Sequence, residues 1–322
     1  MPPATIQLGV VMDPIESIKP KKDSTLAMLL EAGRRGAEIH YLQQHDLRLI
    51  GGKAFGRSRV VSVRDDPDNW YEFGSSQDIP LADLDVILMR KDPPFDMEYI
   101  YTSYILERAE LGGARVVNRP QSLRDMNEKA YTAWFNDCAP LTLVTRSMID
   151  MKQFLKEHHR IVVKPLDGMG GRSIFVVAKG DNNANVIFET LTDNGRRFAI
   201  AQVYIPEINA GDKRILLVNG EPIPYALARI PSQDDNRGNL VMGAVGEGRE
   251  LTDRDRWICS RVGPVLKERG VIFAGIDVIG DYLTEINVTS PTGIRELDAK
   301  YGLNIAGTLF DAIVAILDDR RT

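Results

Sequence analysis

Short apolar runs alternate with amphipathic stretches along roughly the first 120 residues of the chain. A short apolar run bounded by turn residues predicts a buried strand, whereas apolar residues three and four positions apart predict a helix packed on one face. Strands are therefore expected at residues 6–12, 39–42, 86–89 and 115–117. Residues 48–80 are polar and rich in turn-forming types, and we expect them to form a hairpin excursion from the sheet. This alternation is typical of a doubly wound α/β domain.

Two helices are expected between these strands. The first should begin at Ser24, whose hydroxyl can cap a helix, and should stop at Gly36. Its inner face would carry Leu26, Leu29, Leu30 and Gly33. The second helix is expected over residues 96–111.

The pattern changes after a break at residues 118–120. Residues 121–135 carry apolar side chains at helical spacing, so this segment is expected to be one helix. Beyond residue 161 the pattern predicts antiparallel strands and short helices, with strands at 199–205, 214–218 and 225–230 and a last helix at 305–317. Residues 231–250 are rich in glycine and polar types, and a long loop of this kind inside a compact domain is often functional.

Composition narrows the class of protein. The 322 residues are 43% hydrophobic and 26% charged, which is ordinary for a soluble globular protein with two or three domains. A net charge of −5 argues against a general nucleic-acid-binding protein. Neither a membrane span nor a secretory signal is visible, so we expect a cytoplasmic protein without membrane or nucleic-acid partners. Two cysteines do not make the pattern of a disulfide framework or a structural zinc site.

The most informative stretch is IVVKPLDGMGGRSIFVV at residues 161–177. A β-branched run ends at Lys164, a turn with Gly168, Gly170 and Gly171 follows, and a second β-branched run closes the unit. Glycine lets backbone N–H groups approach a polyphosphate, and Lys164 adds a positive charge. The lysine precedes the glycines, so the stretch matches neither the Walker A loop nor the dinucleotide fingerprint. Taken alone, it is read equally well as a phosphate loop or as a plain β-hairpin with a glycine-rich turn.

A second group of polar residues lies in residues 272–288, which read as strand, turn and strand. Glu285 and Asn287 are two positions apart, so on a strand they share one face, and their oxygens suit a hard cation such as Mg²⁺. Asp277 can join them only if the turn is odd in length, because a two-residue turn would pair it with Thr284 and send it to the other face. We therefore predict a three-residue loop at 280–282, with Asp277 opposite Glu285. The alternative for Glu285 and Asn287 is a solvated strand face.

Basic residues would complete a nucleotide site. Lys129 is expected on the helix at 121–135, and Arg214 and Arg229 are expected on the two strands after residue 210. A nucleoside triphosphate brings about four negative charges, which several fixed cations would have to hold. Each of these residues alone is read more simply as exposed surface, and only the set as a whole favours a nucleotide site.

The same residues, in this order, resemble the ATP-grasp fold, and nearly the whole chain is similar to the bacterial glutathione synthetase family. The stretches that carry the resemblance are MDP at 12–14, LMRKDPPFD at 88–96, NRPQSLRDMNEK at 118–129, KPLDGMGG at 164–171, GDKR at 211–214, ARIP at 228–231, RGN at 237–239 and LTEINVTSPTGIRE at 283–296. Together these stretches are specific, whereas GDKR or EIN alone would not be.

The resemblance implies a doubly wound N-terminal α/β domain at residues 1–122 and two α+β subdomains that clasp ATP, at 123–200 and 201–322, with a mobile loop at 231–250. It implies a ligase in which ATP phosphorylates the glycine-proximal carboxylate of γ-glutamylcysteine. Glycine then attacks the acyl phosphate, which gives glutathione, ADP and phosphate. Mg²⁺ is implied as the metal, with Mn²⁺ as a substitute, and a homotetramer as the assembly.

The resemblance also implies a role for each candidate residue. The ATP-binding residues would be Lys129, Lys164, Gly168, Met169, Gly170, Gly171, Gln202, Tyr204, Ile205 and Asp212. The metal ligands would be Asp277, Glu285 and Asn287. The residues that stabilise the transferred phosphoryl group would be Arg214 and Arg229, with Arg237 reaching in from the loop. The dipeptide-binding residues would be Arg90, Thr289 and Ser290.

One departure from the family pattern falls in the loop at 231–250. The family usually continues after R-G-N with two glycines and a basic residue, whereas here Gly243 is followed by Ala244 and Val245. The loss of one glycine and one charge concerns the contacts and closing rate of the loop, and leaves the phosphate and metal positions unaffected.

Three other functions stay open at this point. Another ATP-dependent carboxylate–amine ligase, such as a dipeptide ligase or a glutamate-adding ligase, would share the ATP and metal residues, although LMRKDPPFD favours a glutathione synthetase. A non-catalytic nucleotide-binding protein would be expected to lack Glu285 or Asn287, and both are present. A dinucleotide-dependent oxidoreductase would fit the alternating first half, but the glycine fingerprint is missing.

Overall fold

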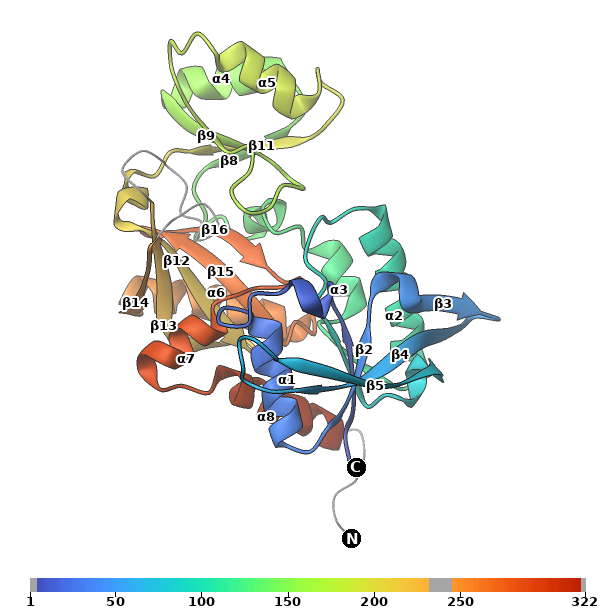
Figure 1. The fold of residues 1–322 in the computed structure, drawn as a ribbon. Helices are drawn as coiled ribbons and strands as arrows, with labels where there is room; N and C mark the ends of the chain where they lie inside the picture. The colour runs from blue at the N-terminus through green and yellow to red at the C-terminus, as the bar shows by residue number, and fades with distance from the viewer. Residues whose placement is uncertain (1–4, 232–244, 320–322) are drawn as a thin grey trace.

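The computed structural model describes residues 5–231 and 245–319, which form three sheets (Figure 1). One sheet of seven strands and one of five make up the lower body in this view, and a sheet of four strands lies above them with its own two helices. The α/β character and the antiparallel second half agree with the fold class expected from the sequence.

The seven-stranded sheet is built from the first part of the chain. Its strands are β1 (Gln7–Val11), β2 (Glu38–Leu42), β3 (Leu47–Ile50), β4 (Lys53–Val63), β5 (Tyr71–Pro80), β6 (Val86–Met89) and β7 (Arg115–Val117). The order is β3-β4-β2-β1-β6-β7, with β5 paired to β4. The pairs β1–β2, β1–β6 and β6–β7 are parallel, whereas β3, β4 and β5 pair antiparallel. The predicted hairpin excursion at 48–80 is confirmed, and it extends the same sheet.

Two helices pack against this sheet, α1 (Ser24–Arg34) and α2 (Met97–Gly112). The predicted cap of α1 was wrong by one residue, because the Asp23 carboxylate accepts the N–H of Leu26 at 2.6 Å. The Ser24 hydroxyl instead accepts the N–H groups of Gly293 and Ile294, at 3.2 and 3.3 Å. Gly36 follows the helix with a left-handed φ of 79°, as a stop signal should.

The predicted helix over residues 121–135 was wrong. The segment contains α3 (Pro120–Asp125) and, after a break, a 3₁₀ helix (Ala130–Trp134). The cause is Asn127, whose side-chain oxygen accepts the N–H groups of Lys129 and Ala130 at 3.1 and 2.9 Å and so fixes a local turn. Lys129 therefore lies at the break between two short helical segments.

The four-stranded sheet is antiparallel, in the order β10-β9-β11-β8. Its elements are β8 (Thr142–Thr145), α4 (Met148–His158), β9 (Arg160–Pro165), β10 (Phe175–Ala178), α5 (Ala184–Thr192) and β11 (Ala199–Val203). The two helices cover its outer face (Figure 1). The buried side chains between them form a cluster of their own, which includes Met151, Phe154, Ile161 and Phe188.

The five-stranded sheet is also antiparallel, in the order β14-β13-β12-β15-β16. Its elements are β12 (Asp212–Val218), β13 (Glu221–Ile230), β14 (Val245–Glu250), α6 (Asp253–Glu268), β15 (Phe273–Ile279), β16 (Tyr282–Asn287), α7 (Ile294–Tyr301) and α8 (Ile305–Asp319). The predicted end of the loop at residue 250 was wrong. Residues 245–250 form β14, and each of them pairs with a residue of β13.

The first and last parts of the chain share buried cores. One cluster joins Leu8 and Leu29 of the N-terminal elements to Leu216, Phe273 and Leu309 of the C-terminal ones. The seven-stranded and five-stranded sheets thus form one packed body, and the four-stranded sheet stands apart with its separate core. Over the described ranges, no single helix has the length and apolarity to cross a membrane, and one bent pair, Ile294–Tyr301 with Ile305–Asp319, passes on length and composition alone.

Candidate active site

A cavity of about 1730 Å³, which includes space open to solvent, lies between the four-stranded and five-stranded sheets. Its walls come from β9, the glycine loop, β11, β12, β13, β15 and β16. The predicted residues that line it are Lys129, Lys164, Gly168, Met169, Gly170, Gly171, Gln202, Tyr204, Ile205, Asp212, Arg214, Arg229, Asp277, Glu285, Asn287, Thr289 and Ser290. Residues as far apart in the sequence as Lys129 and Ser290 thus meet in one place.

The hairpin of β15 and β16 positions the predicted metal ligands. The predicted three-residue loop was wrong, because Ile279 pairs with Tyr282 and only Gly280 and Asp281 lie between the strands. The predicted pairing of Asp277 with Glu285 is nevertheless present, because the register shifts by one residue between Asp277 and Val278. The extra residue in this β-bulge is Thr284, whose hydroxyl donates to the backbone oxygen of Asp277 at 3.1 Å.

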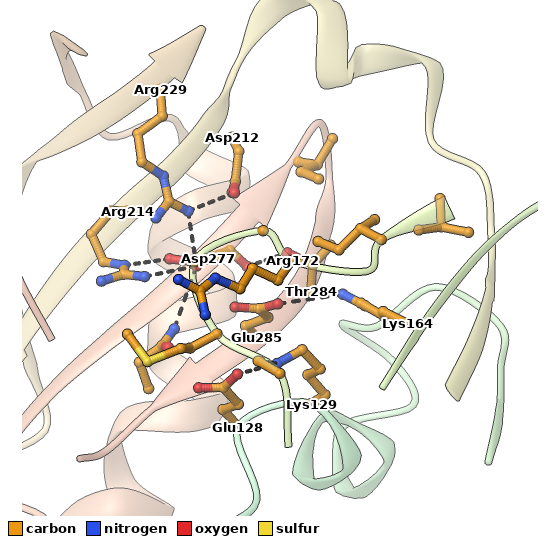
Figure 2. A pocket seen from close by; sticks show the side chains of 18 of the residues that line it. Glu128, Lys129, Lys164, Arg172, Asp212, Arg214, Arg229, Asp277, Thr284 and Glu285 are labelled. Carbon is orange, nitrogen blue, oxygen red and sulfur yellow. Dashed lines mark hydrogen bonds and ion pairs between the residues drawn. The ribbon is translucent and has the colours of Figure 1, made fainter. Parts of the chain in front are cut away.

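Asp277 is the centre of a buried ion-pair network (Figure 2). Arg214 donates to both of its carboxylate oxygens, with Nη2 at 2.9 Å from Oδ2, and Arg229 Nη2 lies 2.8 Å from Oδ2. Arg229 also donates to Asp212 at 2.5 Å. The sheet register explains these contacts, since Arg214 lies directly opposite Asp277 and Asp212 directly opposite Arg229.

The two aspartates of this network have pKa values shifted in opposite directions. Burial raises the pKa of Asp277, but the guanidinium groups of Arg214 and Arg229 outweigh burial and hold it below its ordinary value. Burial raises the pKa of Asp212 to about 7, since the attraction of Arg229 offsets only part of that penalty and the charges of Asp277 and Glu285 raise it further. One Asp212 oxygen is buried without a hydrogen-bond partner within the described structure.

Two buried lysines lie on the opposite wall of the cavity. Lys164, at the end of β9, has its Nζ 3.5 Å from Glu285 Oε1. Lys129 donates to the backbone oxygen of Gly168 at 2.6 Å and to the Glu128 carboxylate, so it ties the glycine loop to the segment before the 3₁₀ helix. Burial lowers the pKa of Lys129, but the negative charges of Glu285 and Glu128 more than compensate and raise it.

Of the two alternatives that the sequence left open for the stretch at 168–171, the β-hairpin is present, and the phosphate loop stays a prediction. β9 and β10 do pair as a hairpin, with Val163 opposite Phe175. The connection between them lines the cavity, and Gly170 and Gly171 have left-handed φ values of 68° and 77°. A side chain at Gly168 would meet Pro165 Cγ at 2.7 Å, so only glycine fits that position without a shift.

An apolar slot lies beside the charged part of the cavity. Its lining side chains are Val162, Ile174, Val176, Ile205, Ile208, Leu227 and Ile279. Gln202 is buried at its edge and donates to the Thr142 hydroxyl at 3.1 Å. A flat heterocycle suits such a slot, because apolar side chains can cover both faces while backbone groups at the edge bind its nitrogens.

Arg90 does not line the cavity. Its buried guanidinium donates to the Thr25 hydroxyl at 3.1 Å and to the backbone oxygen of Pro291 at 3.0 Å. Its own backbone oxygen accepts the Ser290 hydroxyl at 3.3 Å. These hydrogen bonds tie Arg90 to the segment at residues 290–291, and its role as a dipeptide-binding residue stays a prediction.

Three charged residues on the cavity wall were not singled out from the sequence: Asp92, Glu128 and Arg172. Arg172 follows the glycine loop directly and lies over the charged part of the cavity (Figure 2). Burial raises the pKa of Glu128, with a further contribution from the negative charge of Glu285, against the attraction of Lys129. Glu128 and Arg172 directly adjoin predicted residues in sequence, and Asp92 lies two positions after Arg90; this closeness is the only signal that could have found them. Arg237 and residues 232–244 of the predicted loop lie outside the described residues.

The residues fit a magnesium ion that is shared with a polyphosphate. Across residues 5–231 and 245–319, no three His, Cys, Asp or Glu side chains are arranged as a metal cluster. Asn287 and Asp277 are nonetheless in contact, with Nδ2 and Oδ2 3.4 Å apart, and Glu285 lies opposite Asp277. Mg²⁺ is commonly held by one or two carboxylates together with substrate phosphates and waters, so this donor set is sufficient when phosphates supply the rest.

A glycine loop and two lysines that face a carboxylate-bearing sheet, in a cavity also lined by apolar side chains, are typical of ATP-grasp ligases. The fold agrees: a D-cycloserine synthetase superposes with a TM-score of 0.68 at 14% identity, covering 96% of this chain and 99% of that one. A D-alanine–D-alanine ligase from Bacillus anthracis, complexed with ATP, superposes with a TM-score of 0.59 at 14% identity, covering 98% and 99%.

Sequence comparison then shows the particular family. Residues 6–124 match the model of the prokaryotic glutathione synthetase N-terminal domain, and residues 128–302 match that of the prokaryotic glutathione synthetase ATP-grasp domain. The chain belongs to the prokaryotic glutathione synthetase family. A glutathione synthetase from Escherichia coli is 59% identical over 98% of this chain and 100% of its own length. One from Salmonella typhimurium is 60% identical over 97% and 99%. The protein is accordingly an ATP-dependent ligase with the activity of that family.

Proposed function

We propose that this cavity joins γ-glutamylcysteine to glycine by way of an acyl phosphate, and that ATP lies between the two sheets. The observation that carries the proposal is the gathering in one cavity of two buried lysines, a glycine loop and a carboxylate–amide pair. A carboxylate is a poor acylating agent at neutral pH, and phosphorylation gives it a leaving group. The enzyme then has mainly to position the reactants and neutralise charge.

In this proposal the nucleotide has two sets of contacts. The adenine lies in the apolar slot beside Gln202, Tyr204 and Ile205, and Asp212 faces the ribose. The phosphates lie against Lys129, Lys164 and the backbone at 168–171. Support comes from the position of both lysines, which are buried and line the same cavity as the glycine loop.

Glu285 and Asn287 are proposed to hold Mg²⁺, or Mn²⁺ in its place, with Asp277 as a third ligand. When bound, the ion would supply positive charge that neutralises the phosphates. Asp277 already accepts hydrogen bonds from two arginines, so its second role would be to hold Arg214 and Arg229 beside the transferred phosphoryl group. Arg90, Thr289 and Ser290 are proposed to bind the dipeptide, and Arg90 also holds the segment at residues 290–291 through its hydrogen bonds.

The remaining proposals concern the loop, the domains and the assembly. The loop at 231–250, or its part before β14, would close over the site with Arg237 and exclude water, which would otherwise hydrolyse the acyl phosphate. The chain would divide near residue 122 and again near residue 200, although the second boundary falls within β11. By family resemblance we propose a cytoplasmic homotetramer.

A coupled ADP-release assay tests the substrates. With γ-glutamylcysteine plus glycine, we expect ADP to form at a rate at least two orders of magnitude above that with either D-alanine or glutamate in place of the natural pair. ADP formed equally with every pair, or with none, would contradict the substrate assignment. Preferential turnover of D-alanine alone would instead favour a dipeptide ligase on the same fold.

A further inference from the structure

Five carboxylates line the cavity within the described part of the chain, and four of them have a cationic partner there. The paired groups are Glu128 with Lys129, Asp212 with Arg229, Asp277 with Arg214 and Arg229, and Glu285 with Lys164. Asp92 is the fifth, and no lysine, arginine or histidine of residues 5–231 and 245–319 lies within ion-pair distance of its carboxylate. An anion without a partner on the wall of a binding cavity is free to bind a positively charged group of a substrate.

The backbone of Asp92 is held on both sides. Its N–H donates to Asp13 Oδ2 at 2.9 Å, and its backbone oxygen accepts from Lys91 Nζ at 2.7 Å. Lys91 Nζ also lies 2.9 Å from Asp13 Oδ1, so its charge is directed to Asp13 and not to the Asp92 carboxylate. Pro93 and Pro94 follow, and their rings restrict the chain further. A carboxylate on so restrained a backbone loses little conformational freedom when a ligand binds.

Asp92 lies beside the residues proposed to bind the dipeptide. Pro93, next to it, lines both the cavity and a smaller hollow to which Thr289 also belongs. The Ser290 hydroxyl donates to the backbone oxygen of Arg90, two residues before Asp92, at 3.3 Å. Burial lowers the pKa of Arg90 and the negative charge of Asp92 opposes that effect, so the two charged groups are near neighbours. None of the apolar side chains assigned to the adenine comes from this part of the chain.

Residues 287–290 connect the proposed metal site to the surroundings of Asp92. Asn287 is a proposed metal ligand and Ser290 contacts Arg90, and three residues of extended chain span at most about 10 Å. In γ-glutamylcysteine, seven bonds separate the carboxyl carbon to be phosphorylated from the α-nitrogen of the glutamyl group, which is about 8 Å when extended. A dipeptide whose reacting carboxylate lies beside the metal can therefore extend along residues 287–290 and bring its α-ammonium group toward Asp92.

We propose that the Asp92 carboxylate binds the α-ammonium group of the glutamyl residue and so selects an acceptor that carries an amine at this end. The proposal rests on the ligase reaction proposed above and names a residue that recognises its substrate. The hydroxyls of Thr289 and Ser290 would bind the neighbouring α-carboxylate, which the positive charge of Arg90 also favours. Glycine is the other substrate with an ammonium group, but its nitrogen attacks the acyl phosphate and must lie beside the reacting carboxyl group.

Steady-state ADP release with glutarylcysteine tests the contact without any variant. This analogue replaces the α-amino group of γ-glutamylcysteine by hydrogen and keeps the carboxylate that reacts. A hydrogen bond to a charged group is stronger than one between neutral groups, so we expect kcat/KM to be about 10- to 100-fold lower for glutarylcysteine, mainly through KM. Equal kcat/KM for the two dipeptides in the unaltered protein would overturn the proposal.

Asp92→Asn tests whether this selectivity comes from Asp92. We expect its kcat/KM to fall about 10- to 100-fold for γ-glutamylcysteine and to change by less than about threefold for glutarylcysteine, with the KM for ATP unchanged. Asp83→Asn is the matched control, because Asp83 is exposed in the N-terminal part of the chain and does not line the cavity. It should keep the selectivity of the unaltered protein, and unaltered thermal unfolding would show that both variants are folded.

The outcomes distinguish the contact from the reaction. Equal losses with both dipeptides in Asp92→Asn would overturn the contact, because a purely structural effect does not depend on the α-amino group. A raised KM for glycine with either dipeptide would place the glycine ammonium at Asp92 and would also overturn the assignment. In both cases the unaltered protein still forms ADP with γ-glutamylcysteine and glycine, so the proposed reaction stands. Absence of ADP with that pair would overturn the reaction and the contact together.

Discussion

The five-stranded sheet contains two hairpins that carry the charged residues of the site and differ in the size of their register shift. Both have two-residue turns, Asn219-Gly220 between β12 and β13 and Gly280-Asp281 between β15 and β16. Both have a register shift. In the first, Ile215 pairs with Ala226 and Leu217 with Pro222, so β13 gains two residues. In the second, Asp277 pairs with Glu285 and Val278 with Leu283, so β16 gains one.

The difference shows what a bulge can do in an active site. Side chains alternate between the faces of a strand, so a shift of two slides them along the strand and leaves each on its original face. A shift of one moves every residue beyond it to the other face. In the β15–β16 hairpin the single extra residue, Thr284, is what brings Glu285 and Asn287 to the face of Asp277.

Among the changes considered for the second hairpin, Glu285→Gln should lower the rate of ADP release most. A neutral amide cannot neutralise a shared cation as a carboxylate does, so we expect turnover to fall by about 10²- to 10³-fold, or about 3–4 kcal/mol of transition-state stabilisation. The measurement is steady-state ADP release across a magnesium titration. Asp281→Asn, in the exposed turn of the same hairpin, is the control and should retain full activity. An unchanged rate in Glu285→Gln would remove that residue from the metal site.

The two turns should differ in how far their surroundings tolerate an added methyl group, placed at Gly263 against the first turn or at Gly280 within the second. A Cβ at Gly263 of α6 would lie 2.0 Å from the backbone oxygen of Gly220. The backbone of the first turn therefore packs directly against the backbone of α6. We expect Gly263→Ala to lower the free energy of unfolding by about 3 kcal/mol, since neither backbone can yield cheaply. At Gly280, with a φ of 55°, the nearest atoms belong to the flexible Glu207 side chain, at 3.0 and 3.1 Å.

Gly280→Ala should therefore cost only about 1 kcal/mol, mostly from its left-handed backbone. Urea denaturation of both variants measures the difference. Equal losses would show that the second turn is held as firmly as the first.

The aspartates of the two hairpins should give pH dependences of opposite sign. The folded pKa of Asp277 lies below its ordinary value of 3.8, so its contribution to stability is present above that pH and is lost as the solution becomes more acidic. The folded pKa of Asp212 is raised from 3.8 to about 7, so the unfolded chain releases this proton first and stability falls as pH rises through that interval.

Asp212→Asn should accordingly reduce the loss of stability between about pH 4 and pH 7 by about 1–2 kcal/mol. Asp277→Asn should reduce the pH dependence only below about pH 4. Urea unfolding followed at a series of pH values distinguishes the two. If both variants changed the pH dependence of stability in the same direction, the pKa values of Asp212 and Asp277 would not be shifted in opposite directions as described.

Thr284→Val tests the smallest component of the bulge. The change keeps the shape of the side chain and removes the hydroxyl that donates to Asp277, so we expect a loss of about 1 kcal/mol in the free energy of unfolding. The same substitution at Thr308, which is exposed on α8 and bonds to the Asn304 backbone oxygen at 3.3 Å, should change stability by less than about 0.5 kcal/mol. A loss at Thr284 no larger than at Thr308 would mean that the bulge does not depend on this hydrogen bond.

Much of the local structure could be predicted from the sequence. The strand at 86–89 was predicted to the residue because a buried parallel strand is a continuous apolar run. The strand at 115–117 was also predicted to the residue, and there two buried valines follow Arg115. The helix over 121–135 was wrong, because apolar spacing does not reveal that the Asn127 side chain binds the N–H groups of the next turn. The loop at 231–250 was too long for a related reason, since the glycines within β14 read as loop and only their pairing with β13 makes them a strand.

By itself the sequence determined the chemistry of this protein: which glycines could line a phosphate site, which lysines and arginines could hold charge, and that Glu285 and Asn287 share a face. Only the tertiary structure decided how those groups meet. The prediction of Asp277 opposite Glu285 was right although its stated reason, an odd turn, was wrong. A one-residue bulge supplies the same change of face, and its position depends on pairing between strands rather than on the residues of either strand alone. The same dependence on distant neighbours ties Arg90 to Pro291 and brings Glu128 and Arg172 to the cavity wall.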